Sequence, residues 1–259
     1  MKHVDFDACD LQRLRHAVNY AHHASETSLE TLLPPWIPRE LKRRIKAECV
    51  VSHCATLLFP PSEEAAAELF RACGWNATDP IPSVLVKQRL TERHRLPEDA
   101  RVLVTRLRPV AGPEVEVFLF PKDDPHYRED IGKAERAHNL ENHVGLFMAR
   151  AREETLRLLT DRLETVGRLV YEGCAHNPHE NTTMVYFAPE ARMAGTRRRF
   201  PRWEVQCPGD LTHALGDRPV RTAALADTYA VLRANVPPGV TAACGETGRA
   251  VSRIPVPLR

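Results

Sequence analysis

The sequence predicts an α+β protein built from two copies of one module, each made of a strand, a helix and three further strands. Three observations carry this prediction. Residues 51–69, VSHCATLLFPPSEEAAAEL, align without a gap with residues 141–159, ENHVGLFMARAREETLRLL, at a constant offset of 90 positions. The same order of strand-like and helix-like segments follows both stretches. Each half also places a His in its first strand and a Glu in its last, as expected for an internal repeat.

The length, composition and net charge of the chain are those of an ordinary globular protein. The chain has 259 residues, with 43% hydrophobic residues and a formal net charge of +2. So small a charge gives no global field that would recruit nucleic acid or an anionic membrane. No apolar run approaches the roughly 18 residues of a membrane helix, and the start, MKHVDFDACD, is too polar for a signal peptide. Seven Cys without a CxxC motif favour reduced thiols and a cytoplasmic location.

Residues 1–48 are expected to form a helical appendage that has no second copy. Apolar residues spaced for one helix face predict a helix over residues 5–31. Prolines between positions 34 and 38 then interrupt the chain, and ELKRRIKAEC predicts another short helix.

The first module is expected over residues 49–122. Residues 50–59 predict a strand that ends at two prolines, and Ser62 is a suitable N-cap for the helix EEAAAELFRACGW, which Gly74 can end. SVLVKQR and ARVLVTRLR predict two strands, PVAGP a turn, and EVEVFLF the closing strand.

After a polar linker, residues 123–138, the second module is expected over residues 139–207. NHVGLFMA predicts its first strand and REETLRLLTDRLETVG its helix. GRLVYEG and TTMVYFA predict a hairpin, and RWEVQC the closing strand. The tail, residues 208–259, contains one helical stretch, RTAALADTYAVLRANV.

Four polar residues lie in the predicted strands, where a charged side chain needs a physical reason. His53 and His143 begin the first strand of each half, and Glu116 and Glu204 lie within the last. The separations, 116 − 53 = 63 and 204 − 143 = 61, are nearly equal. Two imidazoles and two carboxylates brought together by a pseudo-two-fold axis would bind a divalent first-row metal.

With this doubled module and these positions the chain resembles the vicinal oxygen chelate superfamily. That family includes glyoxalase I, methylmalonyl-CoA epimerase, the extradiol dioxygenases and the fosfomycin and bleomycin resistance proteins. The resemblance covers about residues 49–207. It implies that the two βαβββ modules form a half-barrel cup, either within one chain or between the chains of a homodimer.

In the glyoxalase-like members the first-strand residue and the last-strand Glu of both modules bind the metal. Carried over, this implies His53, Glu116, His143 and Glu204 as ligands of Zn, Ni, Co, Mn or Fe(II). The implied reaction is isomerisation, epimerisation or lyase chemistry on a small oxygenated metabolite, through a metal-stabilised enolate. Glu116 or Glu204, alternating between ligand and base, or else Glu180, would take the proton.

The segment GCAHNPHENTT offers further candidates. In the chelate fold this hairpin borders the cup, so His176, His179 or Tyr186 could contact the substrate. The Cys and two His could also suggest a zinc site, but the Asn-Pro dipeptide favours a plain turn. Residues 197–199, three arginines, could clamp a carboxylate or phosphate or form a solvated basic loop.

Two other functions stay open at this point. An extradiol-type Fe(II) dioxygenase would use His143, Glu204 and His53 as its three ligands. A metal-free protein that binds a small molecule, as in antibiotic resistance, would need an aromatic-lined cup, and the chain has only 6% aromatic residues. In all three cases the expected partner is a small molecule.

Overall fold

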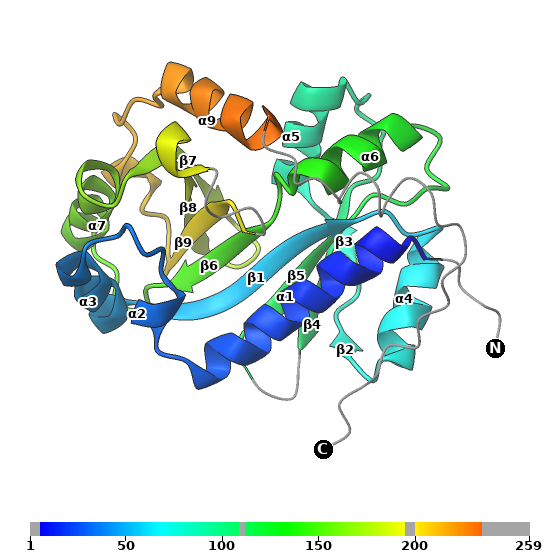
Figure 1. The fold of residues 1–259 in the computed structure, drawn as a ribbon, viewed down its shortest axis with the longest axis horizontal. Helices are drawn as coiled ribbons and strands as arrows, with labels where there is room; N and C mark the ends of the chain where they lie inside the picture. Colours follow the sequence, from blue (N-terminus) through cyan, green and yellow to red (C-terminus); the bar gives the residue numbers. More distant parts are fainter. Residues whose placement is uncertain (1–5, 109–111, 195–199, 235–259) are drawn as a thin grey trace. The chain divides into compact units, whose positions relative to one another are not determined.

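The computed structural model describes residues 6–108, 112–194 and 200–234, and these form two compact units. The first unit contains residues 6–22 and Ala55–Glu141, and the second contains His23–Cys54 and residues 142–234. Figure 1 traces the chain through both. Strand β1, Val50–Leu58, contributes its beginning to the second unit and its end to the first.

Helices and strands occur in both units, which confirms the α+β class. The α-helices are α1 (Ala8–Glu26), α2 (Leu29–Leu32), α3 (Arg39–Glu48), α4 (Glu63–Ala72), α5 (Val84–His94), α6 (Glu129–His138), α7 (Glu153–Thr165), α8 (Ala191–Ala194) and α9 (Thr222–Ala234). The other strands are β2 (Asn76–Ala77), β3 (Ile81–Pro82), β4 (Leu103–Arg108), β5 (Glu114–Leu119), β6 (His143–Phe147), β7 (Leu169–Asn177), β8 (Thr182–Pro189) and β9 (Arg202–Pro208). A short 3-10 helix, η1, spans Thr212–Ala214.

The strands of the first unit follow the order β2–β4–β5–β1, with β3 also paired to β4. The β4–β5 pair is antiparallel. Just beyond the ends of β5 and β1, Phe120 N donates to Leu58 O and Lys122 N donates to Pro60 O. Because the bonds advance together along both segments, the first and last strands run parallel there.

The second unit repeats this arrangement with the strand order β6–β9–β8–β7. Here too the first strand, β6, pairs in parallel with the last, β9, and the other pairs are antiparallel. The predicted order strand–helix–strand–strand–strand is therefore confirmed for the strands and helix α7 of the second half, whereas the first half has helix α5 between β3 and β4. The predicted domain boundaries stay a prediction.

One predicted strand of the first module is wrong. SVLVKQR is not a strand but the first part of helix α5. The residues that α5 buries, Val86 and Leu90, are four positions apart, which is the period of a helix face. The second strand of this half is instead the pair of two-residue strands β2 and β3, which precede α5.

Two further expectations need correction. The segment expected as a polar linker contains helix α6. The helix expected over residues 5–31 is two helices, because α1 ends at Glu26 and α2 begins at Leu29. The predicted turn PVAGP lies partly outside the described residues, since positions 109–111 are not described.

The caps predicted for the first-module helix are confirmed at both ends of α4. Ser62 Oγ accepts a hydrogen bond from Ala65 N at 3.2 Å. At the other end Gly74 has φ 71°, and Trp75 N donates to Phe70 O. A residue with a side chain would be strained in this left-handed conformation, so glycine suits the position.

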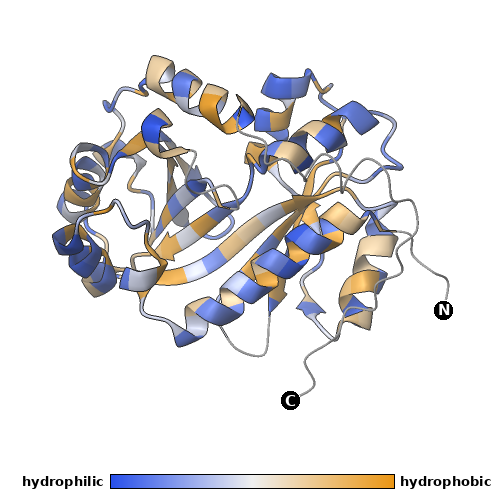
Figure 2. Cartoon of the chain, viewed as in Figure 1, coloured by the Kyte–Doolittle hydropathy of each residue, from blue (hydrophilic) through white to orange (hydrophobic). Residues whose placement is uncertain are grey.

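The core of the first unit lies between its strands and helices α5 and α6. Its buried cluster joins the end of β1 and the end of β5 to both helices: Ala55, Leu57, Phe59, Val86, Leu90, Leu96, Ala100, Val102, Phe118, Phe120 and Ile131. Helix α1 buries Cys9, Leu14, Ala17 and Ala21 together with the charged Asp10 and Arg13, and hydrophilic and hydrophobic residues alternate along the side seen in Figure 2. Its buried Asp10 accepts a hydrogen bond from Phe59 N and pairs with Arg136 of α6.

In the second unit the two faces of the sheet differ in chemistry. The strand register places Val144, Trp203, Val205, Val185 and Phe187 on one face, and all of them are buried. The other face carries the His143, Arg202, Glu204 and Tyr186 side chains, which are buried as well. A sheet face that buries four polar or aromatic polar groups is where a functional site is expected.

The expectation of reduced thiols is wrong at one position, because Cys9 is disulfide-bonded. Among the residues that the structure describes, Cys49, Cys54, Cys73, Cys174 and Cys207 are free thiols. Within the described ranges no helix combines the length and apolar character needed to cross a membrane. The cytoplasmic location stays a prediction.

Candidate metal centre

Three of the predicted metal ligands lie in the second unit. His143 begins β6, Glu204 lies on the neighbouring strand β9, and His53 comes from the beginning of β1. Gly145 is the register partner of Glu204, so Glu204 and His143 project from the same face two residues apart along the pair. The parallel pairing of the first and last strands therefore brings the His and Glu of one module together.

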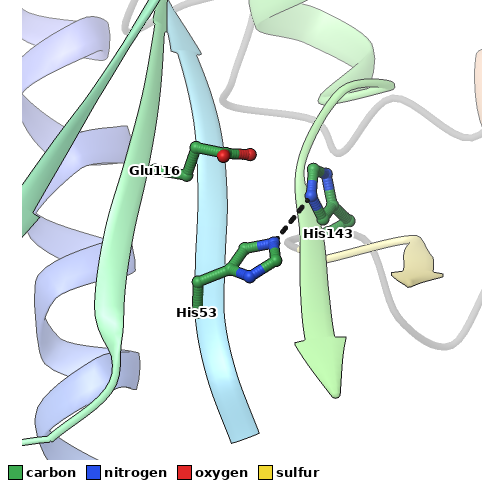
Figure 3. A group of neighbouring side chains, drawn as sticks. All are labelled: His53, Glu116 and His143. Carbon is green, nitrogen blue, oxygen red and sulfur yellow. Dashed lines mark hydrogen bonds between the residues drawn. The ribbon is translucent and has the colours of Figure 1, made fainter. Parts of the chain in front are cut away.

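The donor atoms of these three side chains converge. His53 and His143 point toward each other from β1 and β6, and their Nε2 atoms are 3.2 Å apart (Figure 3). Glu204 Oε2 is 3.2 Å from His143 Nε2 and 4.0 Å from His53 Nε2. The two rings are nearly perpendicular, at 89°.

These separations fit a bound first-row metal. With bonds of about 2.1 Å, two neighbouring ligand atoms of such an ion stand about 3.0–3.4 Å apart. Two of the three separations already have this length. The side chains are also nearly closed to solvent, with His53 6%, His143 2% and Glu204 2% exposed.

Glu204 has one oxygen that the described residues leave without a partner. Its Oε1 is buried and makes no hydrogen bond to residues 6–108, 112–194 or 200–234. A buried carboxylate oxygen of this kind costs free energy unless something compensates it. A metal ion bound by Glu204 would do so, and the residues present therefore fit such an ion.

Gly145 makes the room that the His53 ring occupies. A Cβ atom built on Gly145 would lie 2.1 Å from His53 Cε1 and 2.3 Å from His53 Nδ1. Any side chain at this position would collide with the imidazole. Gly145 is thus part of the site although it offers no ligand atom.

Ser52 is placed to fix the tautomer of His53. Its Oγ is 3.1 Å from His53 Nδ1. In the tautomer that carries its proton on Nδ1, His53 donates to Ser52 Oγ and presents an unprotonated Nε2 to the site. Orienting contacts of this kind are the usual support of metal-binding imidazoles.

The electrostatics of the site favour an ionised Glu204. Burial by itself would raise the pKa of this carboxyl group. The hydrogen bond from His143 and the nearby His53 and His143 charges outweigh burial and lower the pKa to about 2. Glu204 is therefore a carboxylate at every pH near neutrality, as a metal ligand must be.

The fourth predicted ligand, Glu116, belongs to the first unit. It lies on β5, opposite Arg106 of β4 in the antiparallel register. Arg106 Nη2 is 3.5 Å from Glu116 Oε1, and the Glu116 side chain is 12% exposed. Its role as a ligand stays a prediction.

The predicted substrate contacts lie at two places in the second unit. Tyr186 is the register partner of Glu204, and its ring meets the His143 ring edge-on at 6.4 Å between centroids. The other candidates, His176, His179 and Glu180, lie at the end of the β7–β8 hairpin.

The hairpin register sets His176 apart from the site. His176 pairs with Thr183, three residues from Tyr186, so it projects from the opposite face of the sheet. His176 Nε2 is 3.2 Å from Asn181 Oδ1, and Asn177 Nδ2 donates to Glu180. Roles for His176, His179 and Glu180 stay predictions. The arginines at positions 197–199 lie outside the described residues.

The sequence prediction did not include Gly145, Ser52 and Arg202. A Gly inside a predicted strand, in NHVGLF, is a signal of close approach by another group, and it could have drawn attention to Gly145. Ser52 precedes His53 directly, and nothing in the sequence distinguishes it from any other serine. The orientation of Arg202 depends on Glu172, which lies 30 residues away in the sequence.

No family model and no curated protein matches the chain. Among solved structures, methylmalonyl-CoA epimerase from Mycobacterium tuberculosis matches with 14% identity and a TM-score of 0.37, over 63% of this chain and 91% of that one. A 4-hydroxymandelate synthase variant from Streptomyces coelicolor matches with 12% identity and a TM-score of 0.39, over 65% of this chain and 54% of that one.

A further match is a variant of methylmalonyl-CoA epimerase from Streptomyces coelicolor in complex with 2-nitronate-propionyl-CoA. It has 13% identity and a TM-score of 0.34, over 61% of this chain and 96% of that one.

Proposed function

We propose that the chain is a metal-dependent enzyme of the vicinal oxygen chelate type. Its substrate would be a small oxygenated metabolite, and its reaction an isomerisation, an epimerisation or a lyase reaction. The observation that carries the proposal is the convergence of two imidazole nitrogens and one carboxylate oxygen on a buried sheet face, with separations of 3.2, 3.2 and 4.0 Å.

His53, His143 and Glu204 would hold the ion, and Glu116 would be the fourth ligand. Glu116 is proposed because it occupies, in the first module, the place that Glu204 has in the second. A divalent metal bound there would act as a Lewis acid on a substrate with two neighbouring oxygens.

The chain's own residues would divide the remaining work. With a pKa of about 2, Glu204 is a weak proton acceptor and is better suited to ligation. Glu116 is then the stronger candidate for the general base. Tyr186 lies beside His143 and would line the substrate's place next to the ion. Burial of the site would exclude bulk water from the proton transfer.

A second candidate function is favoured by one feature of the site. Two His and one carboxylate within a single unit are the ligand set of non-haem Fe(II) oxygenases. If His53, His143 and Glu204 are the complete set, the remaining positions are open to dioxygen and a diol. In that case the proposed function is that of an extradiol-type dioxygenase.

Elemental analysis tests the metal site. The full chain would be purified without added metal or chelator, beside His143→Ala, Glu204→Ala and, as a matched control, the exposed hairpin variant His179→Ala. We expect about one equivalent of a transition metal in the wild type and the control, and none in the two site variants. A wild type that is metal-free and binds no metal on titration would overturn the proposal in favour of a metal-free binding protein.

Glu116→Gln separates the two catalytic candidates. If Glu116 is a ligand and base, this variant binds the metal more weakly and fails to exchange a carbonyl-adjacent proton with deuterium from D2O. If the enzyme is a dioxygenase, the variant keeps its Fe(II), and wild type and variant alike consume oxygen with catechol as the probe diol. The metal found in the wild type distinguishes the two functions independently, because the dioxygenase requires iron.

A further inference from the structure

A buried Arg202 lies on the same sheet face of the second unit as the candidate metal ligands His143 and Glu204. It is the register partner of His143 on the β6–β9 pair and is 1% exposed. Its guanidinium carbon lies 5.5 Å from the centroid of the Tyr186 ring. This is within the range of a cation–π contact, which gains strength when both groups are removed from water.

Glu172 fixes the orientation of this guanidinium. Arg202 Nε and Nη2 lie 2.7 and 2.6 Å from Glu172 Oε2. Glu172 is the residue that β7 inserts between Tyr171 and Gly173, where the pairing with β8 shifts. A β-bulge of this kind re-aims a side chain, here toward Arg202.

The other oxygen of Glu172 connects to helix α9. Tyr229 of α9 donates its hydroxyl to Glu172 Oε1. A chain of contacts therefore runs from Tyr229 through Glu172 and Arg202 to the Tyr186 ring. That ring in turn meets the His143 ring edge-on, at 90° between the planes.

We propose that Arg202 is the positioning residue of the metal site, holding Tyr186 and through it the His143 imidazole in ligand geometry, with α9 as its anchor. This inference rests on the proposed metal site and assigns a role beyond it. In this role Arg202 acts through the Tyr186 ring and not as a ligand of the ion. It acts because a planar guanidinium clamped by Glu172 gives the Tyr186 ring a fixed support.

The second unit supplies a matched control for this arrangement. Arg218 lies over the ring of Tyr171, 5.8 Å from the centroid, and pairs with Glu164 and Asp161. It has the same chemistry, an arginine over a tyrosine of the β7–β8 hairpin with carboxylate partners. Tyr171 pairs with Phe187, on the face opposite to Tyr186 and Glu204.

The test is Co(II) binding by the full-length, metal-stripped protein, read as the dissociation constant and the visible absorption spectrum of the bound ion. The variants are Glu172→Gln/Arg202→Met, which removes the pair without leaving a lone buried charge, and Arg218→Met. We expect the double variant to bind Co(II) about tenfold more weakly with an altered spectrum. Arg218→Met should bind as the wild type does.

Two further readouts separate the possible failures. Tyr229→Phe removes a single hydroxyl, so it serves if the double variant does not fold, and it should change the spectrum in the same direction to a smaller extent. A folded double variant, or Tyr229→Phe in its place, with the wild-type spectrum and affinity would overturn the positioning role while leaving the metal site intact. A wild type that binds no Co(II) would instead overturn the proposed function, and the positioning role with it.

Discussion

At the scale of single residues, the candidate site combines proposed ligands that the internal repeat predicts with supporting residues that the repeat does not indicate. His53, His143 and Glu204 were predicted because residues of the same type recur at matched places in two similar halves. Gly145, Ser52 and Arg202 have no such repeat signature. Their roles depend on distances across strands, as in the 3.1 Å contact of Ser52 with His53, and those distances exist only in the folded chain.

Gly145→Ala should abolish metal binding while leaving the protein folded. The added methyl group would overlap the His53 ring, and that ring must turn away from His143. Metal content after purification measures the loss of binding, and the thermal unfolding midpoint shows whether the variant is still folded. Gly216→Ala is the control, because a Cβ there would meet its nearest neighbour at an ordinary 3.7 Å. Full metal content in Gly145→Ala would contradict the role assigned to Gly145.

The ionised Glu204 carboxylate should stabilise the folded protein, and this stabilisation should be lost at acid pH. Its folded-state pKa, about 2, lies below the usual value of about 4.3 for an unfolded chain. A lowered pKa gives a stabilisation that is complete above the unfolded value and is lost as the pH falls through the folded one. The loss therefore falls between about pH 5 and pH 2.

The check is the free energy of urea unfolding of metal-stripped wild type and Glu204→Gln over that range of pH. The advantage of the wild type should be largest near pH 5 and should shrink as the pH approaches 2. An advantage that stays constant across the range would show that the Glu204 carboxylate is not the titrating group.

At the scale of elements, periodicity predicted most helices and strands, and it failed where a short run was ambiguous. SVLVKQR combines three β-branched or apolar residues at its start with a charged end, which is typical of a strand. The apolar face of this segment continues to Leu90, one residue beyond the predicted strand. Because Val86 and Leu90 both pack in the core, the segment is helical. The two-residue strands that replace it, β2 and β3, are too short to give any periodic signal.

Helices α5 and α6 of the first unit share a buried ionic cluster. Arg93 of α5 donates to Glu135 of α6 at 2.8 Å and to Glu141 at 2.6 Å. Glu135 is 2% exposed and Glu141 is fully buried. One guanidinium thus joins two helices and the segment that leads into β6.

Arg93→Met should destabilise the protein by about 2–3 kcal/mol, because it removes the cation shared by two buried carboxylates. The loss stays below that of an uncompensated buried charge, since Glu141 keeps Arg89 and Glu135 keeps His94 as a partner. Urea unfolding at neutral pH measures this change. Arg43→Met is the control, since Arg43 pairs with Glu40 on the exposed surface of α3, where an ion pair contributes about 0–1 kcal/mol. Equal effects of the two substitutions would contradict the importance given to the buried cluster.

At the scale of the whole molecule, the duplicated order of elements was predictable and the composition of the two compact units was not. The repeat follows from aligned residues and matching strand orders. The unit to which a segment belongs depends on which strands it contacts. No local pattern indicates that the beginning of β1, with His53, belongs with residues 142–234.

Metal binding should stabilise the whole folded chain. A ligand that binds only the folded state, present at 100 times its dissociation constant, adds about 2.7 kcal/mol. Thermal unfolding with Co(II) and with EDTA measures this difference. His143→Ala should show no difference between the two conditions, and an equal shift in this variant would place the bound ion elsewhere on the protein.

The division of β1 between the units has a consequence for biosynthesis. His53 and His143 are 90 residues apart, and the first unit's residues 55–141 lie between them in the chain. His53 therefore leaves the ribosome long before the strands that surround it, and the intervening segment can begin to fold first. With the proposed ligand set, the nascent chain would gain its affinity for metal only when β9 has emerged with Glu204. Binding of the proposed ion would then follow synthesis of nearly the whole described chain.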